Sequence, residues 1–235
     1  MGQYSEVFCR VYNEFGWNYY PEAFGQQLLQ WLEENNISVK ASLDLACGTG
    51  ILCGILAGAG IQAAGADLSE GMITVARENH PHIPFTVADM TQYRPEASFD
   101  LVTCTGDSLN HLMTLSQLEQ VFRNVYHCLN PDGYFVFDLL NEKEVSTDEP
   151  FVFPFSDTIT ARFQMLRRPD GVINLKTRIF EQGEFRFEEN IYETLHDPEI
   201  VCNLLQCIGF REVVCRDRLL PSANKSTTWY ILARK

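Results

Sequence analysis

The sequence predicts a doubly wound α/β fold, in which a mostly parallel sheet carries helices on both faces and an antiparallel β subdomain is inserted late in the chain. Two patterns predict it. Between residues 42 and 139, short β-favouring runs alternate with stretches of helical periodicity, as the crossovers between parallel strands require. Over residues 151–195 this alternation gives way to successive β-favouring runs, two of which flank the turn 169–171.

The N-terminal segment is rich in aromatic side chains. Tyr4, Phe8 and Tyr12 recur at helical spacing, which is typical either of a stripe packed on the core or of a lid over a ligand. Breaks are expected at Gly16 and Pro21, followed by a helix over 23–34. We therefore expect residues 1–36 to form an aromatic helical lid.

The α/β core is expected over residues 37–147. Its strands are predicted at 42–46, 62–67, 84–88, 99–104 and 133–139, with helices at 50–58, 70–80 and 115–129. Strands at 158–166, 172–180 and 184–195 are predicted to form an antiparallel insertion, 148–196, that covers the site. A helix at 197–209 and strands at 211–218 and 228–233 then complete the core sheet, 197–235.

Composition and charge exclude several classes of protein. With 235 residues, 46% of them hydrophobic, the chain is suited to one α/β domain with an elaboration. The net charge of −13 disfavours a nucleic-acid partner, and the densest basic pair, Arg167-Arg168, is typical of a solvated turn. No basic segment precedes an apolar run and no apolar stretch could span a bilayer, so we expect a soluble, cytoplasmic protein without membrane contact.

The eight cysteines are scattered and include no C-x-x-C pair. Several lie inside apolar segments, which is typical of buried thiols in a reducing compartment. His80 and His82 form the only close histidine pair and have no cysteine near them in sequence, so no metal site is expected.

Glycines and acids follow the predicted strands at the edge where an open parallel sheet binds ligands. Gly48 and Gly50 end the first strand and open a helix, which brings backbone amides close to a ligand. With Gly54 they form G-x-G-x-x-x-G, which differs from the G-x-G-x-x-G typical of NAD-binding proteins. Asp67 ends the second strand, where a carboxylate accepts hydrogen bonds from both hydroxyls of a ribose.

A second acid makes the pattern more specific. Asp89-Met90 ends the third strand, where a carboxylate accepts from an adenine amino group and apolar side chains sandwich the ring. Taken singly, Asp67 and Asp89 are also ordinary loop or cap residues. Found together at successive strand ends, they favour an adenosine site.

These segments resemble the ordered motifs of class I S-adenosylmethionine-dependent methyltransferases, which have a Rossmann-like sheet: residues 43–50, 67–72, 89–90, 99–102 and 129–133. The resemblance implies that Asp44 and the glycine loop receive the methionine portion of the cofactor, Asp67 the ribose, and Asp89 with Met90 the adenine. The expected cofactor-binding set is Tyr12, Trp17, Tyr20, Asp44, Ala46, Cys47, Gly48, Gly50, Asp67, Leu68, Met72, Asp89, Met90 and Cys104.

In layout the chain also resembles small bacterial methyltransferases with an aromatic N-terminal lid and a late β insertion, among them sugar-amine and glycine-type N-methyltransferases. Residues 106–112 fall where these enzymes carry a short polar loop facing the methyl group. The resemblance implies in-line transfer of a methyl group to nitrogen or oxygen of a small-molecule acceptor.

Three residues of this loop are candidates for catalysis. His111 is a candidate for accepting or orienting a proton, because histidine titrates near neutrality; a role at a helix start or in packing is the alternative. Asp107 and Asn110 are candidates for orienting the substrate, and a helix N-cap is the alternative for Asp107. The aromatic faces of Tyr12, Trp17 and Tyr20 suit a positively charged sulfonium.

The sequence is also compatible with other functions. The sequence lacks the Asp/Asn-Pro-Pro-Tyr/Phe run and the Pro-Cys dipeptide of methyltransferases that act on flipped DNA bases, which favours a small molecule over a tRNA or protein acceptor. An NAD-dependent oxidoreductase and a catalytically silent cofactor-binding scaffold are the alternatives from other classes. Both a monomer and a homodimer are compatible with the sequence.

Overall fold

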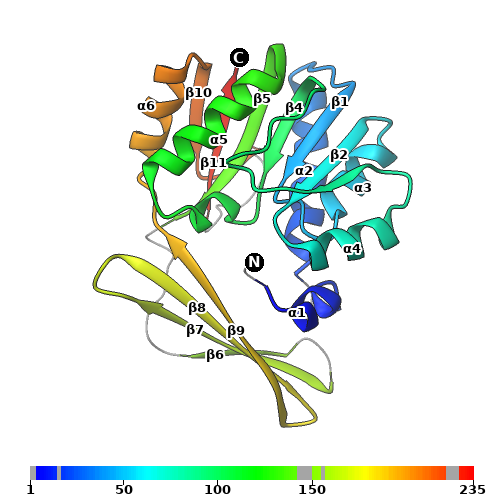
Figure 1. Ribbon diagram of the computed structural model, residues 1–235, viewed down its shortest axis with the longest axis vertical. Helices are drawn as coiled ribbons and strands as arrows, with labels where there is room; N and C mark the ends of the chain where they lie inside the picture. Colours follow the sequence, from blue (N-terminus) through cyan, green and yellow to red (C-terminus); the bar gives the residue numbers. More distant parts are fainter. Residues whose placement is uncertain (1–3, 15–16, 142–149, 155–156, 221–227) are drawn as a thin grey trace.

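The computed structural model describes residues 4–14, 17–141, 150–154, 157–220 and 228–235. It has a seven-stranded sheet in the order β10-β11-β5-β4-β1-β2-β3 and a separate four-stranded sheet in the order β6-β7-β8-β9 (Figure 1). Strands β1 to β5 run parallel, whereas β11 is antiparallel to both of its neighbours, β5 and β10. The predicted fold class, a doubly wound and mostly parallel sheet with an antiparallel insertion, is confirmed.

The core elements lie close to their predicted positions. They are β1 (Ala41–Leu45), α3 (Ile51–Gly58), β2 (Gln62–Asp67), α4 (Glu70–Asn79), β3 (Phe85–Val87), β4 (Phe99–Cys104), α5 (Leu115–Cys128) and β5 (Leu129–Leu140). β5 begins four residues before the predicted strand, because Leu129 already pairs with Phe99 ahead of a register shift. α6 (Pro198–Ile208), β10 (Arg211–Arg216) and β11 (Thr228–Arg234) complete the large sheet.

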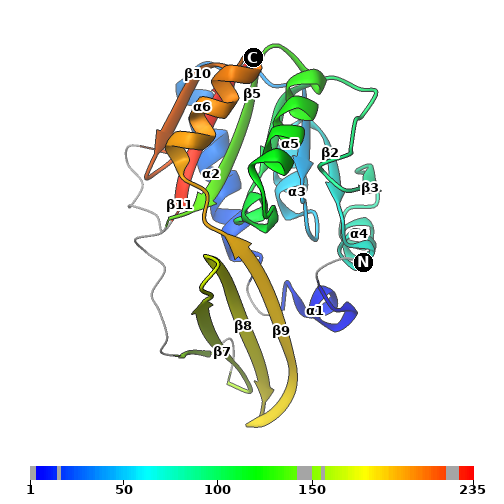
Figure 2. The ribbon, with the colours of Figure 1, turned by 60° about the vertical axis from the view of Figure 1, so that its left-hand side comes forward.

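Helices cover both faces of the large sheet (Figure 2). Apolar side chains of α5 and α6 pack on one face, where Phe122, Phe135 and Phe137 contact one another with ring centroids 4.5–5.9 Å apart. Side chains of α2 (Tyr19–Glu34), α3 and α4 pack on the other face. With both faces buried, the strand ends are left as the place where a ligand can reach the sheet.

Of the two predicted breaks, the one at Gly16 lies outside the described residues, and the one at Pro21 is wrong. α2 begins at Tyr19, and Pro21 lies in its first turn, where a missing backbone N–H leaves no intrahelical hydrogen bond unmade. The helix therefore starts four residues earlier than expected. This earlier start places Tyr20 on the first turn of the helix, next to the sheet edge.

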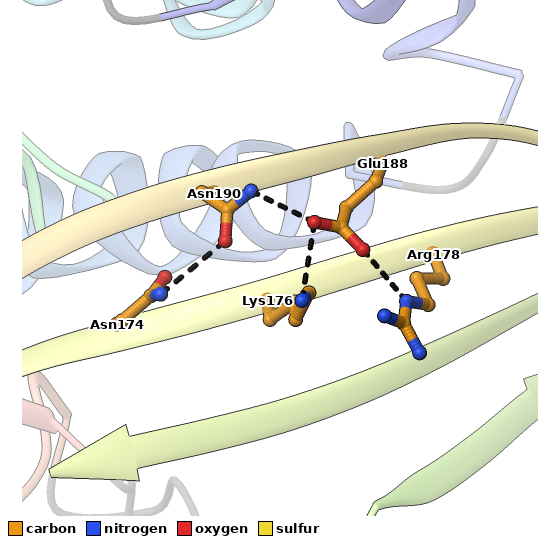
Figure 3. A network of polar contacts seen from close by, with 5 residues as sticks. All are labelled: Asn174, Lys176, Arg178, Glu188 and Asn190. Atoms are coloured by element: carbon orange, nitrogen blue, oxygen red, sulfur yellow. Dashed lines mark hydrogen bonds and ion pairs between the residues drawn. The ribbon is translucent and has the colours of Figure 1, made fainter.

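The insertion consists of β6 (Phe151–Pro154), β7 (Ile159–Arg167), β8 (Val172–Glu181) and β9 (Glu184–Thr194), all antiparallel. The three longer strands match the predicted ones, and β6 is an additional strand. On the outer face of β8 and β9, Glu188 accepts hydrogen bonds from Arg178 (2.7 Å) and Asn190 (3.1 Å) and pairs with Lys176 (3.2 Å) (Figure 3). Because side chains alternate along a strand, the opposite face of β9 presents Glu189, Ile191 and Glu193.

Within the described part of the chain, no helix is both long and apolar enough to cross a membrane. The domain boundaries predicted from the sequence stay a prediction.

Candidate active site

A cavity of about 520 Å³ lies between the carboxyl ends of β1 to β4, the short helix α1 (Glu6–Val11) and the inner face of β8 and β9. In Figure 1 α1 lies between the two sheets. The volume falls in the range of roughly 300–1,000 Å³ that is typical of small-molecule sites. Of the predicted site residues, the cavity brings together Tyr12, Trp17, Tyr20, Asp44, Ala46, Cys47, Gly48, Asp67, Leu68, Met72, Asp89, Met90, Asp107 and His111.

The glycines after β1 have different roles. Gly50 has a φ of 81° and does not line the cavity; a Cβ on it would lie 2.7 Å from Cζ of Phe85, so it permits the loop to pack closely on β3. Gly48, with a φ of 53°, does line the cavity, and a Cβ on it would meet no protein atom within 4 Å. At Gly48 the backbone is therefore open to a ligand.

Asp67 joins the ends of the first two strands. Its Oδ2 accepts a hydrogen bond from the Gly48 N–H (2.9 Å) and its Oδ1 accepts one from the Ser69 N–H (2.8 Å). Burial raises the pKa of the Asp67 carboxyl, and the two backbone donors counteract this shift. Each oxygen keeps a further lone pair, so the carboxylate can still accept from a ribose.

The other predicted cofactor residues differ in their access to the cavity. Asp44 is buried and accepts from the Thr103 hydroxyl (2.6 Å), and burial raises the pKa of Asp44 to about 7. Asp89 accepts through Oδ1 from the N–H and the hydroxyl of Thr91 (2.8 and 2.7 Å), and Oδ2 takes part in neither bond. Cys104 is fully buried in the core and does not line the cavity, which Thr105 reaches instead.

Aromatic side chains from the N-terminal segment close the cavity. Tyr4 stacks on Phe8 with ring centroids 5.0 Å apart, Phe8 contacts Trp17 (4.8 Å), and Trp17 stacks on Tyr12 (5.8 Å). All four line the cavity, although Phe8 is fully buried. The predicted stripe therefore packs on the core and also faces the ligand space.

Two hydrogen bonds hold this segment in place. The Ser5 hydroxyl, which caps α1, donates to Glu189 on β9 (2.7 Å), and the Thr49 hydroxyl donates to Oδ1 of Asn13 (2.7 Å). The N-terminal segment is thus tied both to the insertion and to the glycine loop.

Asp138 on β5 is a buried residue beneath the cavity that is absent from the predicted set. It accepts from the Tyr20 hydroxyl, from the Gly106 N–H (2.9 Å) and from the Asp107 N–H (2.8 Å). Burial raises the pKa of Asp138 to about 6. A lone acid within the apolar run 134–140 is the sequence signal that could have identified it.

His111 lines the cavity at the end of a 3₁₀ helix, η1 (Ser108–His111). Its Nδ1 lies 3.2 Å from the Tyr192 carbonyl, which can only accept, so Nδ1 carries the proton. Its Nε2 then accepts from the Tyr4 hydroxyl (3.3 Å). Because burial lowers the pKa of His111, the imidazole is neutral at pH 7.

Asn110 lies apart from the cavity. It is fully buried, its amide nitrogen donates to the Thr194 carbonyl (2.8 Å), and its Oδ1 accepts from the Leu140 N–H (3.0 Å). Both ends of the amide are therefore bound to main chain. This placement does not agree with the predicted contact to substrate and instead joins η1 to β5 and β9.

Two further carboxyls, those of Asp107 and Glu193, line the cavity. Asp107 has a φ of 57°, and its Oδ1 is buried without a hydrogen-bond partner. Glu193, from the inner face of β9, is only 7% exposed and also lines the cavity. Burial raises the pKa of Glu193 to about 7, with a further contribution from the charge of Asp138. Glu193 is absent from the predicted set.

The raised pKa values predict how stability depends on pH. Asp44 and Glu193, with pKa values of about 7, bind a proton more tightly in the folded than in the unfolded state, so their contribution to stability is lost as pH rises through 7. We expect the free energy of unfolding of the unliganded protein to fall by about 1–2 kcal/mol between pH 6.5 and 8, as measured by urea denaturation. The lowered pKa values of His80, His111 and His196 act in the opposite direction, and their effect ends a little above the unfolded pKa of about 6.5.

Asp44→Asn is the matched variant for this measurement, because it removes one of the two carboxyls whose pKa is about 7 and retains an acceptor for Thr103. We expect stability to fall less steeply with pH in this variant than in the unmodified chain, and the remaining slope to come from Glu193 and from Asp107, whose pKa is also raised by burial. A stability that stays constant or increases from pH 6.5 to 8 would contradict the prediction.

The chain is similar in sequence to known methyltransferases over the strands and loops that form the cavity. Residues 43–133 match the family described as a methyltransferase domain. The Bacillus subtilis protein YqeM is 33% identical over 153 residues, which cover 63% of this chain and 59% of the relative. The dTDP-3-amino-3,6-dideoxy-alpha-D-glucopyranose N,N-dimethyltransferase of Streptomyces fradiae is 28% identical over 137 residues, covering 58% and 53%. The chain thus spans little more than half the length of these curated relatives.

A solved structure matches the whole chain. S-adenosylmethionine-bound CalS10, an amino pentose methyltransferase from Micromonospora echinaspora, has a TM-score of 0.78 at 18% identity, and the match covers 100% of this chain and 99% of that one. The chain has the fold of class I S-adenosylmethionine-dependent methyltransferases.

Proposed function

We propose that this protein is an S-adenosylmethionine-dependent methyltransferase that transfers a methyl group to nitrogen or oxygen of a small-molecule acceptor. One observation carries the proposal: a single cavity brings the glycine loop, Asp67 and Asp89 together with the aromatic side chains of the N-terminal segment. The relatives named above, which include an amino-sugar methyltransferase and an amino pentose methyltransferase, support a small acceptor.

The residues present fit this cofactor. Gly48 leaves space where any other residue would place a side chain, and Asp67 lies beside it to accept from the ribose. Asp89 would hold the adenine amino group, and Asp44 the amino group of the methionine portion. When bound, S-adenosylmethionine supplies an electrophilic methyl carbon on a sulfonium.

The protein's own part in the reaction is to align the acceptor, exclude water and remove a proton. Tyr4, Tyr12 and Trp17 present aromatic faces, which attract a positive charge and keep the cavity apolar. Among the described residues that line the cavity there is no Lys or Arg, so the site favours neutral or cationic molecules over anionic ones. This disfavours a tRNA acceptor.

We also propose that the protein acts in the cytoplasm. All eight cysteines are free thiols, which is typical of a reducing compartment.

The proposal is tested by calorimetry with S-adenosylmethionine and with NAD, followed by transfer of a labelled methyl group to a panel of small amines and hydroxy compounds. We expect S-adenosylmethionine to bind, NAD not to bind, and label to enter at least one acceptor. Binding of NAD alone would favour an oxidoreductase. Cofactor binding without transfer to any acceptor would favour a silent scaffold.

A further inference from the structure

The side chains that β9 presents to the inside of the molecule include Phe187, Glu189, Ile191 and Glu193, and the first three have an evident structural role. Glu189 accepts from Ser5 of the N-terminal segment, and Ile191 packs in the cluster that contains Phe8 and Met72. Glu193 is different: it lines the cavity, is only 7% exposed, and its carboxylate makes no hydrogen bond within the described part of the chain. A carboxylate that faces a confined cavity lined by aromatic rings is poorly solvated, so a ligand that pairs with Glu193 would stabilise its charged form.

The backbone on each side of Glu193 is held in position. Asn110 donates to the carbonyl of Thr194 (2.8 Å), and Nδ1 of His111 donates to the carbonyl of Tyr192 (3.2 Å). Both donors lie on η1, so the 3₁₀ helix clamps the strand at the residues before and after Glu193. The carboxylate is thereby held at the cavity wall by rigid elements.

Asp107 lies near Glu193 and also lacks a partner. Its N–H is bound by Asp138 (2.8 Å), which fixes its backbone, while its Oδ1 is buried without a hydrogen bond. The pKa of Asp107 is raised, first by burial and then by the negative charges of Asp138 and Glu193. Asp107 and Glu193 are therefore close enough to interact electrostatically. Asp138 itself accepts from three donors and is satisfied by the protein.

The missing partner of this carboxyl pair is a cation. The cavity lining offers neither Lys nor Arg in its described part, and within the described residues no group of three His, Cys, Asp or Glu side chains is arranged to hold a metal ion. The surrounding side chains are the aromatic rings of Tyr4, Tyr12 and Trp17, which favour organic cations. Two carboxyls beside aromatic rings, with neither Lys nor Arg in the described lining, favour the binding of an organic ammonium group.

We propose that Glu193 and Asp107 bind the ammonium group of the acceptor, that the acceptor is therefore a primary or secondary amine, and that Glu193 removes its proton. This rests on the proposed function and makes it more specific. A hydroxy acceptor would leave both carboxyls without a cation.

Methyl transfer to the amine consists of loss of a proton and attack of nitrogen on the methyl carbon. An N–H bond of the ammonium breaks, its electron pair stays on nitrogen, and the proton forms an O–H bond with Glu193. The nitrogen lone pair then forms a bond to the methyl carbon, the carbon–sulfur bond breaks, and its electron pair remains on sulfur as a thioether. Glu193 afterwards returns its proton to water.

The groups around Glu193 suit this role. Burial and the charge of Asp138 on β5 raise the pKa of Glu193 to about 7, close to the value that is best for a proton acceptor at neutral pH. Tyr4 from the N-terminal segment and Asp107 from the loop before η1 are the other titratable groups that face it. His111, predicted from the sequence as the proton acceptor, already uses Nε2 to accept from Tyr4.

The test compares Glu193→Gln with Glu184→Gln, an exposed glutamate on the same strand. The probes are the matched pairs cyclohexylamine and cyclohexanol, and glucosamine and glucose, titrated by calorimetry or ligand-observed NMR at pH 7.5 without cofactor. We expect an amine to bind about tenfold or more tightly than its hydroxy counterpart, and Glu193→Gln to remove this preference while Glu184→Gln retains it. S-adenosylmethionine affinity should stay within about threefold of that of the unmodified chain in both variants.

A second readout is the pH dependence of the preference. In the unmodified chain, amine affinity should increase as pH rises through about 7, because Glu193 becomes charged, and in Glu193→Gln this increase should be lost. Equal binding of amine and hydroxy compounds, or unchanged amine affinity in Glu193→Gln, would overturn the proposal. Since these titrations need no cofactor, they decide on the amine site even if S-adenosylmethionine fails to bind, which would overturn the proposed function.

Discussion

Replacement of Gly48 by Val is expected to lower the affinity for S-adenosylmethionine by about 100-fold, or ~3 kcal/mol. Gly48 lines the cavity at the end of β1, and a Cβ there would meet no protein atom within 4 Å. A branched side chain would therefore occupy space that the ligand needs, and overfilling a well-shaped site typically costs about 1–3 kcal/mol. Calorimetric titration with S-adenosylmethionine measures the effect.

Gly60→Val is the matched control for this experiment. Gly60 also has a positive φ (86°) and open space at its Cβ, but it is exposed at the end of α3 and does not line the cavity. Both variants carry the strain of a β-branched residue in left-handed conformation, about 1–3 kcal/mol of stability. Only Gly48→Val should lose cofactor affinity. If Gly48→Val binds as tightly as Gly60→Val, the glycine loop does not contact the cofactor.

Asp67→Asn is expected to lower both cofactor affinity, by about 100-fold, and the free energy of unfolding, by about 1–3 kcal/mol. Each carboxylate oxygen accepts from one backbone N–H, of Gly48 or of Ser69. In either orientation, an amide would place its NH₂ group against one of these donors. The substitution therefore releases either the glycine loop or the turn into α4, and it also removes an acceptor for the ribose. Urea denaturation and calorimetry give the two quantities.

The control for Asp67→Asn is Asp197→Asn. Asp197 caps α6 and accepts from the N–H two residues ahead (2.8 Å), as Asp67 does, but it is exposed and distant from the cavity in the fold. Asn is as good an N-cap as Asp, so we expect stability to change by less than about 0.5 kcal/mol and cofactor affinity to be unaffected. If the two variants lose similar amounts of stability and of cofactor affinity, Asp67 acts only as a cap and does not contact the cofactor.

The bounds of an element agree best with those predicted from the sequence where the element is defined by its own residues. The strands at 62–67 and 99–104 have the predicted bounds, because an apolar run closed by an acid or a polar turn defines a buried strand locally. Gly48, Asp67 and Asp89 were predictable as a group, since parallel strands end at one edge of the sheet. Local patterns failed at Pro21, where a helix start and a chain break have the same residue signature.

The sequence by itself determined the doubly wound core, the glycine loop and the acids at the strand ends, because hydrophobic periodicity and strand order act over short distances along the chain. Only the tertiary structure decided which side chains share the cavity. Glu193 lies 86 residues from Asp107 in sequence, and their meeting depends on η1 clamping β9 through Asn110 and His111. Asn110 and Cys104, next to site residues in sequence, face the core instead. Such choices depend on how the insertion docks against the sheet, which no local pattern encodes.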